Sequence, residues 1–324
     1  MNKQMKKKVV AIGGGTGLSV LLRGLKRHQV DITAIVAVSD DGGSTGRIRE
    51  QLGIPAPGDI RNVIAALSNV EPMLEQIFQY RFKSQDDGGE LSGHSLGNVI
   101  LAAMTDITGS FATGVRELGK VLNVKGHVLP ASDSYITLHA EMEDGEIVSG
   151  ESKIPKCGKG VKHVFLTPSD IRPHPYAKRA ILEADLIVMS PGSLYTSLLP
   201  NLIIPGMSDY IAGSSARKAY ICNVMTQHGE TQNYRASDHI RAIVDHIGDD
   251  CIQTVVVNKQ DLLPQNVILK YKEEVATPVE MDIDNLLKMN LNVIEDDVVL
   301  LEGTSVRHDG LKISKILAEM IGVK

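Results

Sequence analysis

Residues 8–17, KVVAIGGGTG, run from a short apolar strand directly into a glycine-rich loop. Residues 18–27 then have helical periodicity, and residues 32–38 form a second apolar strand, so the opening of the chain has the order and length of a βαβ unit. The two strands of such a unit are parallel, and the helix crosses over between them. The sequence therefore predicts an α/β fold built on a mostly parallel sheet.

Glycine-rich or small-residue loops follow three of the predicted strands. The first is residues 13–17, the second is residues 40–46 (DDGGSTG), and the third is residues 191–197 (PGSLYTS), after a buried strand predicted at 185–190. The carboxyl ends of parallel strands converge on one crevice, and backbone amides at a helix start favour a phosphate. We expect nucleotide phosphates to bind at Gly13, Gly14, Gly15, Thr16, Gly17, Gly192, Ser193 and Leu194.

The exact sequence of the first loop limits which nucleotide it could bind. It lacks the Lys of a Walker loop, and Leu18 stands where a dinucleotide fingerprint has its third glycine. Both differences count against the commonest nucleotide motifs, although NAD stays an alternative ligand. A tight turn between strand and helix, without any ligand, is the structural alternative for this loop.

Carboxylates lie close to the second loop in the sequence. Asp40 and Asp41 could hold Mg²⁺ against a diphosphate or accept a hydrogen bond from a ribose, and solvated turn carboxylates are the alternative. Asp59 is expected to cap the next helix or to supply a further carboxylate. If a metal binds, we expect Asp40 and Asp59 to hold it. We place these carboxylates in one polar pocket with Ser44, Asn62, His94 and Asn98.

Two of the candidate residues, His94 and Ser193, could each have a different role. His94 could act as an acid or base, or it could be a locally bonded side chain at a helix entry. Ser193, in the phosphate group above, could equally be a plain helix cap.

A second group of polar residues follows later strands, predicted at 218–223 and 252–257. Asn223 and Thr226 come at the end of the first of these strands, and their amide and hydroxyl groups could bind a base or a sugar. Tyr271 and Arg307 could provide a flat face for a nucleobase, in a chain where aromatic residues are only 4%. Loop bridging and surface packing are the alternative roles. We expect base and sugar contacts from Asn223, Thr226, Tyr271 and Arg307.

The domain organisation reads as one unit. Residues 1–324 are expected to form a single domain with a β-rich insertion at about 121–167, because residues 135–143 alternate and Asp144 and Gly145 form a hairpin turn. The tail, residues 310–321, is predicted to be an amphipathic helix.

Composition limits the class of protein. The 324 residues are 43% hydrophobic and carry a net charge of −5 with no Trp, which favours an ordinary globular protein and disfavours a nucleic-acid partner. Three cysteines without paired spacing indicate neither a disulfide framework nor a zinc site, and a cytoplasmic location is expected. No apolar run reaches the ~20 residues that span a membrane.

Six segments together closely resemble the gluconeogenesis-factor (YvcK) family, itself related to the 2-phospho-L-lactate transferases (CofD). The segments begin at residue 11 (AIGGGTGLS), residue 38 (VSDDGGSTGR), residue 57 (PGDIRN), residue 93 (GHSLGN), residue 191 (PGSLYTS) and residue 222 (CNVMTQ). The resemblance implies a Rossmann-like three-layer fold with its site at the strand carboxyl ends.

The resemblance also implies a function. Members of the gluconeogenesis-factor family are linked to UDP-sugar binding, such as UDP-N-acetylglucosamine, and to cell shape during growth on gluconeogenic carbon sources. We therefore expect a nucleotide-sugar-binding regulatory protein, acting as a possible homo-oligomer or with an unidentified protein partner in cell-wall synthesis.

The transferase branch implies an alternative, a Mg²⁺-dependent enzyme whose metal-binding aspartates correspond to Asp40 or Asp41 together with Asp59. This chain has glycines at 42, 43 and 46 where the transferases carry bulky aromatic and His residues. An NAD(P)-dependent oxidoreductase is the second alternative.

Overall fold

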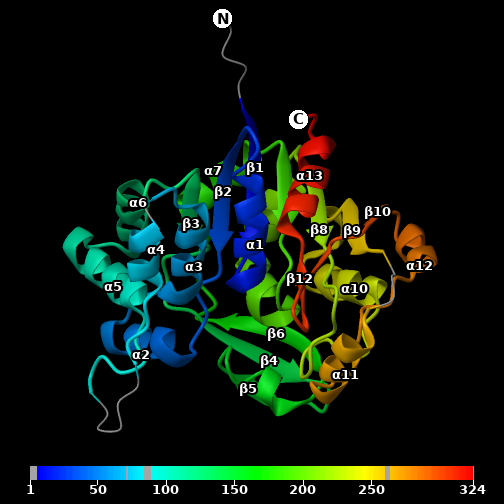
Figure 1. Cartoon of the computed structure of the whole chain (residues 1–324), viewed down its shortest axis with the longest axis horizontal. Coiled ribbons are helices and arrows are strands. Elements are labelled where there is room, and N and C mark those ends of the chain that lie inside the picture. Colours follow the sequence, from blue (N-terminus) through cyan, green and yellow to red (C-terminus); the bar gives the residue numbers. More distant parts are fainter. Residues whose placement is uncertain (1–5, 71, 84–88, 260–262, 324) are drawn as a thin grey trace, which may run out of the picture.

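The computed structural model describes residues 6–70, 72–83, 89–259 and 263–323, and its centre is a seven-stranded sheet (Figure 1). Every pair of neighbouring strands in this sheet is parallel, so the predicted α/β fold with a mostly parallel sheet is confirmed. Across the sheet the strands are β10 (Asn292–Asp296), β9 (Thr254–Asn258), β8 (Arg217–Ile221), β7 (Leu186–Met189), β1 (Lys7–Gly13), β2 (Val30–Val36) and β3 (His127–Pro130).

The direction of chain progression reverses between β1 and β7. From β1 the chain moves outward to β2 and β3 on one side, whereas β7, β8, β9 and β10 follow one another on the other side. Ile12 of β1 is in register with Ile35 of β2 and with Met189 of β7. A reversal of this kind opens a crevice at the carboxyl ends of the two central strands, and ligands of α/β proteins bind there.

Helices flank the sheet. α1 (Gly15–Leu25), α3 (Pro57–Leu67) and α13 (Gly310–Met320) lie together over one face (Figure 1), and α1 buries Leu18, Leu21, Leu22 and Leu25 at helical spacing. On the β2–β3 side of the sheet, α6 (Phe111–Val121) packs beside β3 and against α5 (Leu96–Thr108), and α5 in turn contacts α4 (Pro72–Gln79) and α2 (Gly43–Leu52) (Figure 1). The other helices are α7 (Pro175–Leu182), α8 (Leu199–Leu202), α9 (Met207–Ala212), α10 (Ala236–Ile247), α11 (Gln265–Glu273) and α12 (Ile283–Lys288). Within the described residues, none is long and apolar enough to cross a bilayer.

A small antiparallel sheet lies below the carboxyl ends of the main strands in Figure 1. Its strands are β4 (Thr137–Met142), β5 (Ile147–Ser149) and β6 (Val161–Thr167), with β4 in the middle. The predicted hairpin turn is present, and Gly145 adopts a φ of +86° there. The small sheet begins at Thr137, later than the start of the β-rich insertion expected at about 121–167. The earlier strand, β3, pairs with β2 in the main sheet instead.

One helix start differs from its prediction. Asp59 does not cap α3, because the helix already begins at Pro57 and Ala56 occupies the cap position. Proline is well suited to the first helical position, since its fixed φ is helical and its missing N–H has no partner to lose. Asp59 therefore lies within the first turn.

A hairpin and a helix near the end of the chain form a separate wall. β11 (Val299–Glu302) pairs with β12 (Ser305–His308), and this hairpin packs on α11 through a small apolar cluster of Met225, Val267 and Val306. The cluster is distinct from the main core. We call α11 with β11 and β12 the outer wall.

Close packing of α1 on α13 predicts a sensitive glycine. A Cβ on Gly24 would overlap the carbonyl oxygen of Gly310, so we expect Gly24→Ala to lower the free energy of unfolding by about 1–3 kcal/mol. The matched control is Gly119→Ala in α6, where the nearest heavy atom lies 3.9 Å away and alanine suits a helix better than glycine. Urea unfolding of both variants measures the difference, and equal stability of the two would contradict the packing argument.

Candidate functional site

A cleft of about 670 Å³ opens where the chain reverses between β1 and β7. We call it the switch-point cleft. Five segments line it: the first glycine loop (Gly14, Gly15, Thr16, Gly17), the segment after β7 (Gly192, Ser193, Ser197), residues 223–228 after β8, α11 (Lys270, Tyr271, Glu274) and residues 305–308 of the outer wall. A volume of this size suits a nucleotide-sized ligand.

The first glycine loop brings the start of α1 to the cleft. Gly15 adopts a left-handed φ of +62°, and a Cβ on Gly17 would overlap the carbonyl oxygen of Pro191. The loop therefore needs glycine at both positions, one for its turn and one for the close approach of the two loops. Thr16 and Gly17 lie in the first turn of α1, where the helix has free N–H groups and partial positive charge. This end of the cleft favours an anion.

The segment after β7 is held by side-chain amides. Asn223 accepts a hydrogen bond from the Gly192 N–H at 3.2 Å and donates one to the Gly192 carbonyl at 2.8 Å, and Gln227 donates to Ser193 Oγ at 2.9 Å. Buried Glu230 then accepts hydrogen bonds from the Tyr195 N–H at 3.2 Å and from Thr196 Oγ1 at 3.0 Å. The Tyr195 amide in the π-helix Leu194–Leu198 is therefore already occupied, and the start of α1 is the more open position for an anion.

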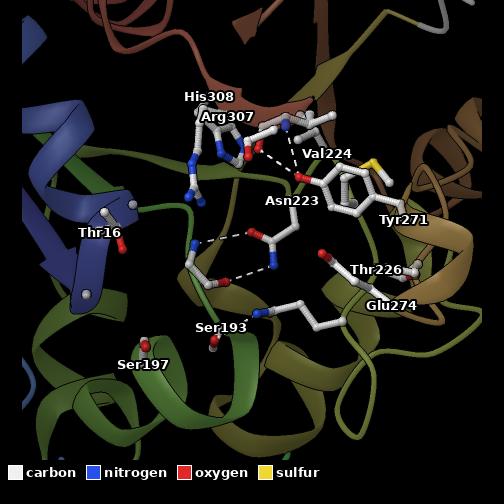
Figure 2. A pocket seen from close by; sticks show the side chains of 18 of the residues that line it. Thr16, Ser193, Ser197, Asn223, Val224, Thr226, Tyr271, Glu274, Arg307 and His308 are labelled. Atoms are coloured by element: carbon white, nitrogen blue, oxygen red, sulfur yellow. Dashed lines mark hydrogen bonds between the residues drawn. The ribbon is translucent and has the colours of Figure 1, made fainter. Parts of the chain in front are cut away.

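The outer wall supplies aromatic and cationic groups. Figure 2 shows the Arg307 guanidinium directed into the cavity between Thr16 and Asn223, and the Tyr271 ring on the opposite side of it. The Tyr271 hydroxyl accepts a hydrogen bond from the Val306 N–H at 2.9 Å, which fixes the ring against β12. Lys270 donates to Ser305 Oγ at 3.1 Å at the rim. Among the described residues that line the cleft, this side thus offers the cations Lys270 and Arg307 and the Tyr271 ring, against the one carboxylate of Glu274, just after α11.

A group of carboxyls lies behind the first glycine loop, away from the cleft. Gly14 packs against Asp59 so closely that a Cβ would overlap the carboxylate, and Asp40 lies near Gly58. Burial raises the pKa of Asp59 to about 7, and the charge of Asp40 adds to that rise. Burial likewise raises the pKa of Glu151 to about 8, with Asp40 and Asp59 as the next causes. Mutual repulsion and burial therefore favour protonated acids here.

The remaining polar candidates form a buried network beside this group. Ser44 Oγ lies 3.2 Å from His94 Nδ1 and accepts hydrogen bonds from the Ser95 N–H at 3.1 Å and from Asn98 Nδ2 at 3.3 Å. Asn62 Oδ1 accepts a hydrogen bond from Arg61 at 2.8 Å. Burial lowers the pKa of His94, which favours its neutral form. The network joins α2, α3 and α5.

Asp41 points to the insertion. Its carboxylate accepts a hydrogen bond from the Ser152 N–H at 2.8 Å, so it ties the second loop to the turn after β5. Within the described part of the chain, no group of three or more His, Cys, Asp or Glu side chains is arranged to hold a metal ion.

Ten of the predicted residues therefore line one cleft and the others lie elsewhere. Those in the cleft are Gly14, Gly15, Thr16, Gly17, Gly192, Ser193, Asn223, Thr226, Tyr271 and Arg307. Buried Gly13 and Leu194 support the two loops from beneath. Asp40, Asp41, Ser44, Asp59, Asn62, His94 and Asn98 are not among its lining residues.

Sequence reasoning missed several residues. Lys270 and Gln227 directly adjoin the predicted residues Tyr271 and Thr226, so their polar side chains beside those residues could have indicated them. Nothing in the sequence around Glu151 indicated that it would lie beside Asp59. Residues 93–97, GHSLG, also spell the pattern of a hydrolase nucleophile elbow. Ser95 is fully buried and accepts a hydrogen bond from Arg61 at 2.8 Å, so it is not an exposed nucleophile.

Comparison with known proteins places the chain. The sequence profile of the family described as 2-phospho-L-lactate transferase CofD matches residues 9–299. The chain belongs to this family. It is 55% identical over 316 residues to the gluconeogenesis factor of Bacillus subtilis strain 168, covering 98% of each chain. It is 56% identical over 314 residues to the gluconeogenesis factor of Halalkalibacterium halodurans, covering 97% of this chain and 96% of that one.

A solved structure agrees with the fold. The crystal structure of protein BH3568 from Bacillus halodurans superimposes with a TM-score of 0.93 at 56% identity, covering 97% of this chain and 99% of that one. The gluconeogenesis-factor resemblance read from the six motifs is thus confirmed over nearly the whole chain.

The buried carboxyls predict how stability depends on pH. Asp59, Glu230 and Glu151 all have raised pKa values, of about 7, 7 and 8. A raised acid binds its proton more tightly in the folded chain, so its stabilisation is present at low pH and is lost as the pH rises toward the raised pKa. These three acids therefore contribute a fall in the free energy of unfolding between about pH 5 and pH 8, which is opposed at the acid end by buried histidines such as His239 and His308, whose pKa values burial lowers. We expect Asp59→Asn to remove the share of that fall that comes from Asp59.

Urea unfolding at pH 5, 6.5 and 8 measures this effect. Asp284→Asn is the control, because Asp284 is exposed on α12. An Asp59→Asn profile parallel to that of the parent protein would show that Asp59 is ionised throughout.

Proposed function

We propose that the switch-point cleft binds a nucleotide sugar, with UDP-N-acetylglucosamine as the representative ligand, and that the protein regulates rather than catalyses. The observation that carries the proposal is the pairing of an anion-favouring helix start, at Thr16 and Gly17, with Arg307 and Tyr271 on the facing wall of the same cleft. A diphosphate placed at α1 leaves the base and the sugar to Tyr271, Thr226 and Arg307.

The physiological part of the proposal follows the names of the relatives. Two proteins of 55% and 56% identity are called gluconeogenesis factors, which supports a role in growth on gluconeogenic carbon sources. We propose that ligand binding in the cytoplasm is coupled there to cell shape through a protein partner of cell-wall synthesis.

Titration calorimetry with UDP-N-acetylglucosamine tests ligand binding. We expect saturable heat, and Arg307→Met should weaken the affinity about ten-fold or more, because the guanidinium contact to the base or sugar is lost. Arg179→Met is the matched control, since Arg179 is exposed on α7 and pairs with Glu183 at 2.8 Å. Binding of GDP or NAD in place of the UDP-sugar would contradict the assignment.

A Mg²⁺-dependent phosphoester transferase is the second candidate function. The observation in its favour is the contact of Asp59 with Gly14, which brings a carboxylate to the back of the phosphate loop, with Asp40 beside it. Mg²⁺ is commonly held by one or two carboxylates with phosphate oxygens of the substrate, so a pair of aspartates suits it. When bound there, the ion would neutralise phosphate charge.

The two functions differ in one variant. If the protein is a transferase, Asp59→Asn should abolish turnover of a nucleotide-activated phosphoester with Mg²⁺ while retaining most nucleotide affinity. If the protein only binds, the parent shows no turnover in the same assay, and the variant keeps UDP-N-acetylglucosamine affinity within about two-fold. Product formation is followed by phosphorus NMR.

A further inference from the structure

Asn223 is bound to the protein in a way that a base-reading residue is not. Both of its amide groups are engaged by one residue: Oδ1 accepts from the Gly192 N–H at 3.2 Å, and Nδ2 donates to the Gly192 carbonyl at 2.8 Å (Figure 2). The side chain is 7% exposed. An Asn that reads a base turns the edge formed by its acceptor and one donor toward that base, and here that edge faces the backbone of Gly192, which leaves one N–H and one lone pair for other partners.

Gly192, which Asn223 holds, lies in neither a strand nor a helix. Gly192 adopts a φ of +147°, a conformation that other L-residues rarely adopt, and it lies beyond the last residue of β7. Pro191, directly before it, contacts Gly17 with its carbonyl oxygen. The Pro191–Gly192 peptide therefore sets how α1 and the segment after β7 meet. The Ser190 hydroxyl donates to the Pro191 carbonyl at 3.3 Å, and Asn223 bonds both backbone groups of Gly192.

We propose that Asn223 is a positioning residue that shapes the phosphate end of the cleft, and that it does not read the base or the sugar. This inference rests on the proposed nucleotide-sugar site. Asn223 supplies for Gly192 the two hydrogen bonds that a neighbouring strand would supply in a sheet. Gln227 extends the clamp by one residue through Ser193 Oγ at 2.9 Å.

Tyr271 is the natural contrast. Its hydroxyl is bonded to the Val306 backbone and Lys270 Nζ lies 5.4 Å from the ring centroid, but the ring lines the cleft and offers it an aromatic surface. Loss of the Tyr271 ring therefore removes base binding, whereas loss of the Asn223 amide disturbs phosphate binding. The two residues should respond to different parts of a ligand.

Partial ligands separate these roles. The affinities of Asn223→Ala, Tyr271→Ala and the parent protein are measured by calorimetry for UDP-N-acetylglucosamine, and by competition for inorganic pyrophosphate and uridine. We expect Asn223→Ala to weaken the UDP-sugar and pyrophosphate by the same factor, about ten-fold for two lost hydrogen bonds, and to leave uridine within about two-fold. Tyr271→Ala should weaken the UDP-sugar and uridine but not pyrophosphate.

Each other outcome has a defined meaning. An Asn223→Ala protein that loses uridine affinity and keeps pyrophosphate affinity overturns the positioning role. If the parent protein binds none of the three ligands, the proposed function fails, and the positioning role is then decided by hydrogen exchange without ligand.

Hydrogen exchange also guards against a variant that is merely misfolded. In Asn223→Ala, and in Asn223→Asp, which keeps the size and the acceptor but loses the donor, we expect faster amide exchange in residues 190–197 and unchanged exchange in β8. Exchange at 190–197 equal to the parent in both variants overturns the proposal. Faster exchange throughout β8 as well would show a general loss of structure, and it would overturn the specific role of Asn223.

Discussion

The contact between Gly17 and the carbonyl oxygen of Pro191 is the constraint on which the site depends. It exists because β1 and β7 are neighbours at the point where the strand order reverses, so the segments that leave them emerge side by side. Any side chain at Gly17 would push the start of α1 away from Pro191 and the segment after β7. The glycine thus fixes the phosphate end of the cleft before any ligand contact is considered.

The first glycine loop has two chemically different sides. Its amides at Thr16 and Gly17 face the cleft, with Arg307 across from them, while Asp59 packs behind Gly14. Negative charge is therefore held on one side of the backbone and attracted to the other. The raised pKa of Asp59 reduces the conflict, because a protonated acid does not repel a phosphate bound a few ångströms away. Glu230 occupies the Tyr195 amide, so the start of α1 is the more favourable place for an anion.

Local pattern was enough to predict the sheet and both glycine loops, because strand, loop and helix follow one another within a single βαβ unit. Local pattern was not enough to predict which polar residues line the cleft and which lie behind the first glycine loop. Asp40 follows β2 and Asn223 follows β8, both at the carboxyl edge of the sheet, yet only Asn223 reaches the cleft. Which way a side chain turns at a strand end depends on packing partners that are distant in sequence. Glu151, brought beside Asp59 by the insertion, shows the same limit.

The outer wall packs around a small apolar cluster of its own. Val267 and Val306 belong to a small cluster with Met225 and not to the core beneath the sheet. Substitutions in that cluster can therefore alter Tyr271, Lys270 or Arg307 with less effect on the main core, although β12 also contacts α1 and His308 Nε2 lies 3.1 Å from the Cys222 carbonyl oxygen. The phosphate end has no such freedom, because its glycines are fixed by backbone contact. If the proposed nucleotide-sugar site is correct, relatives that share this scaffold are expected to keep the two segments that meet at Gly17 and Pro191, and to differ at the wall, where Tyr271 and Arg307 would meet the variable parts of a ligand.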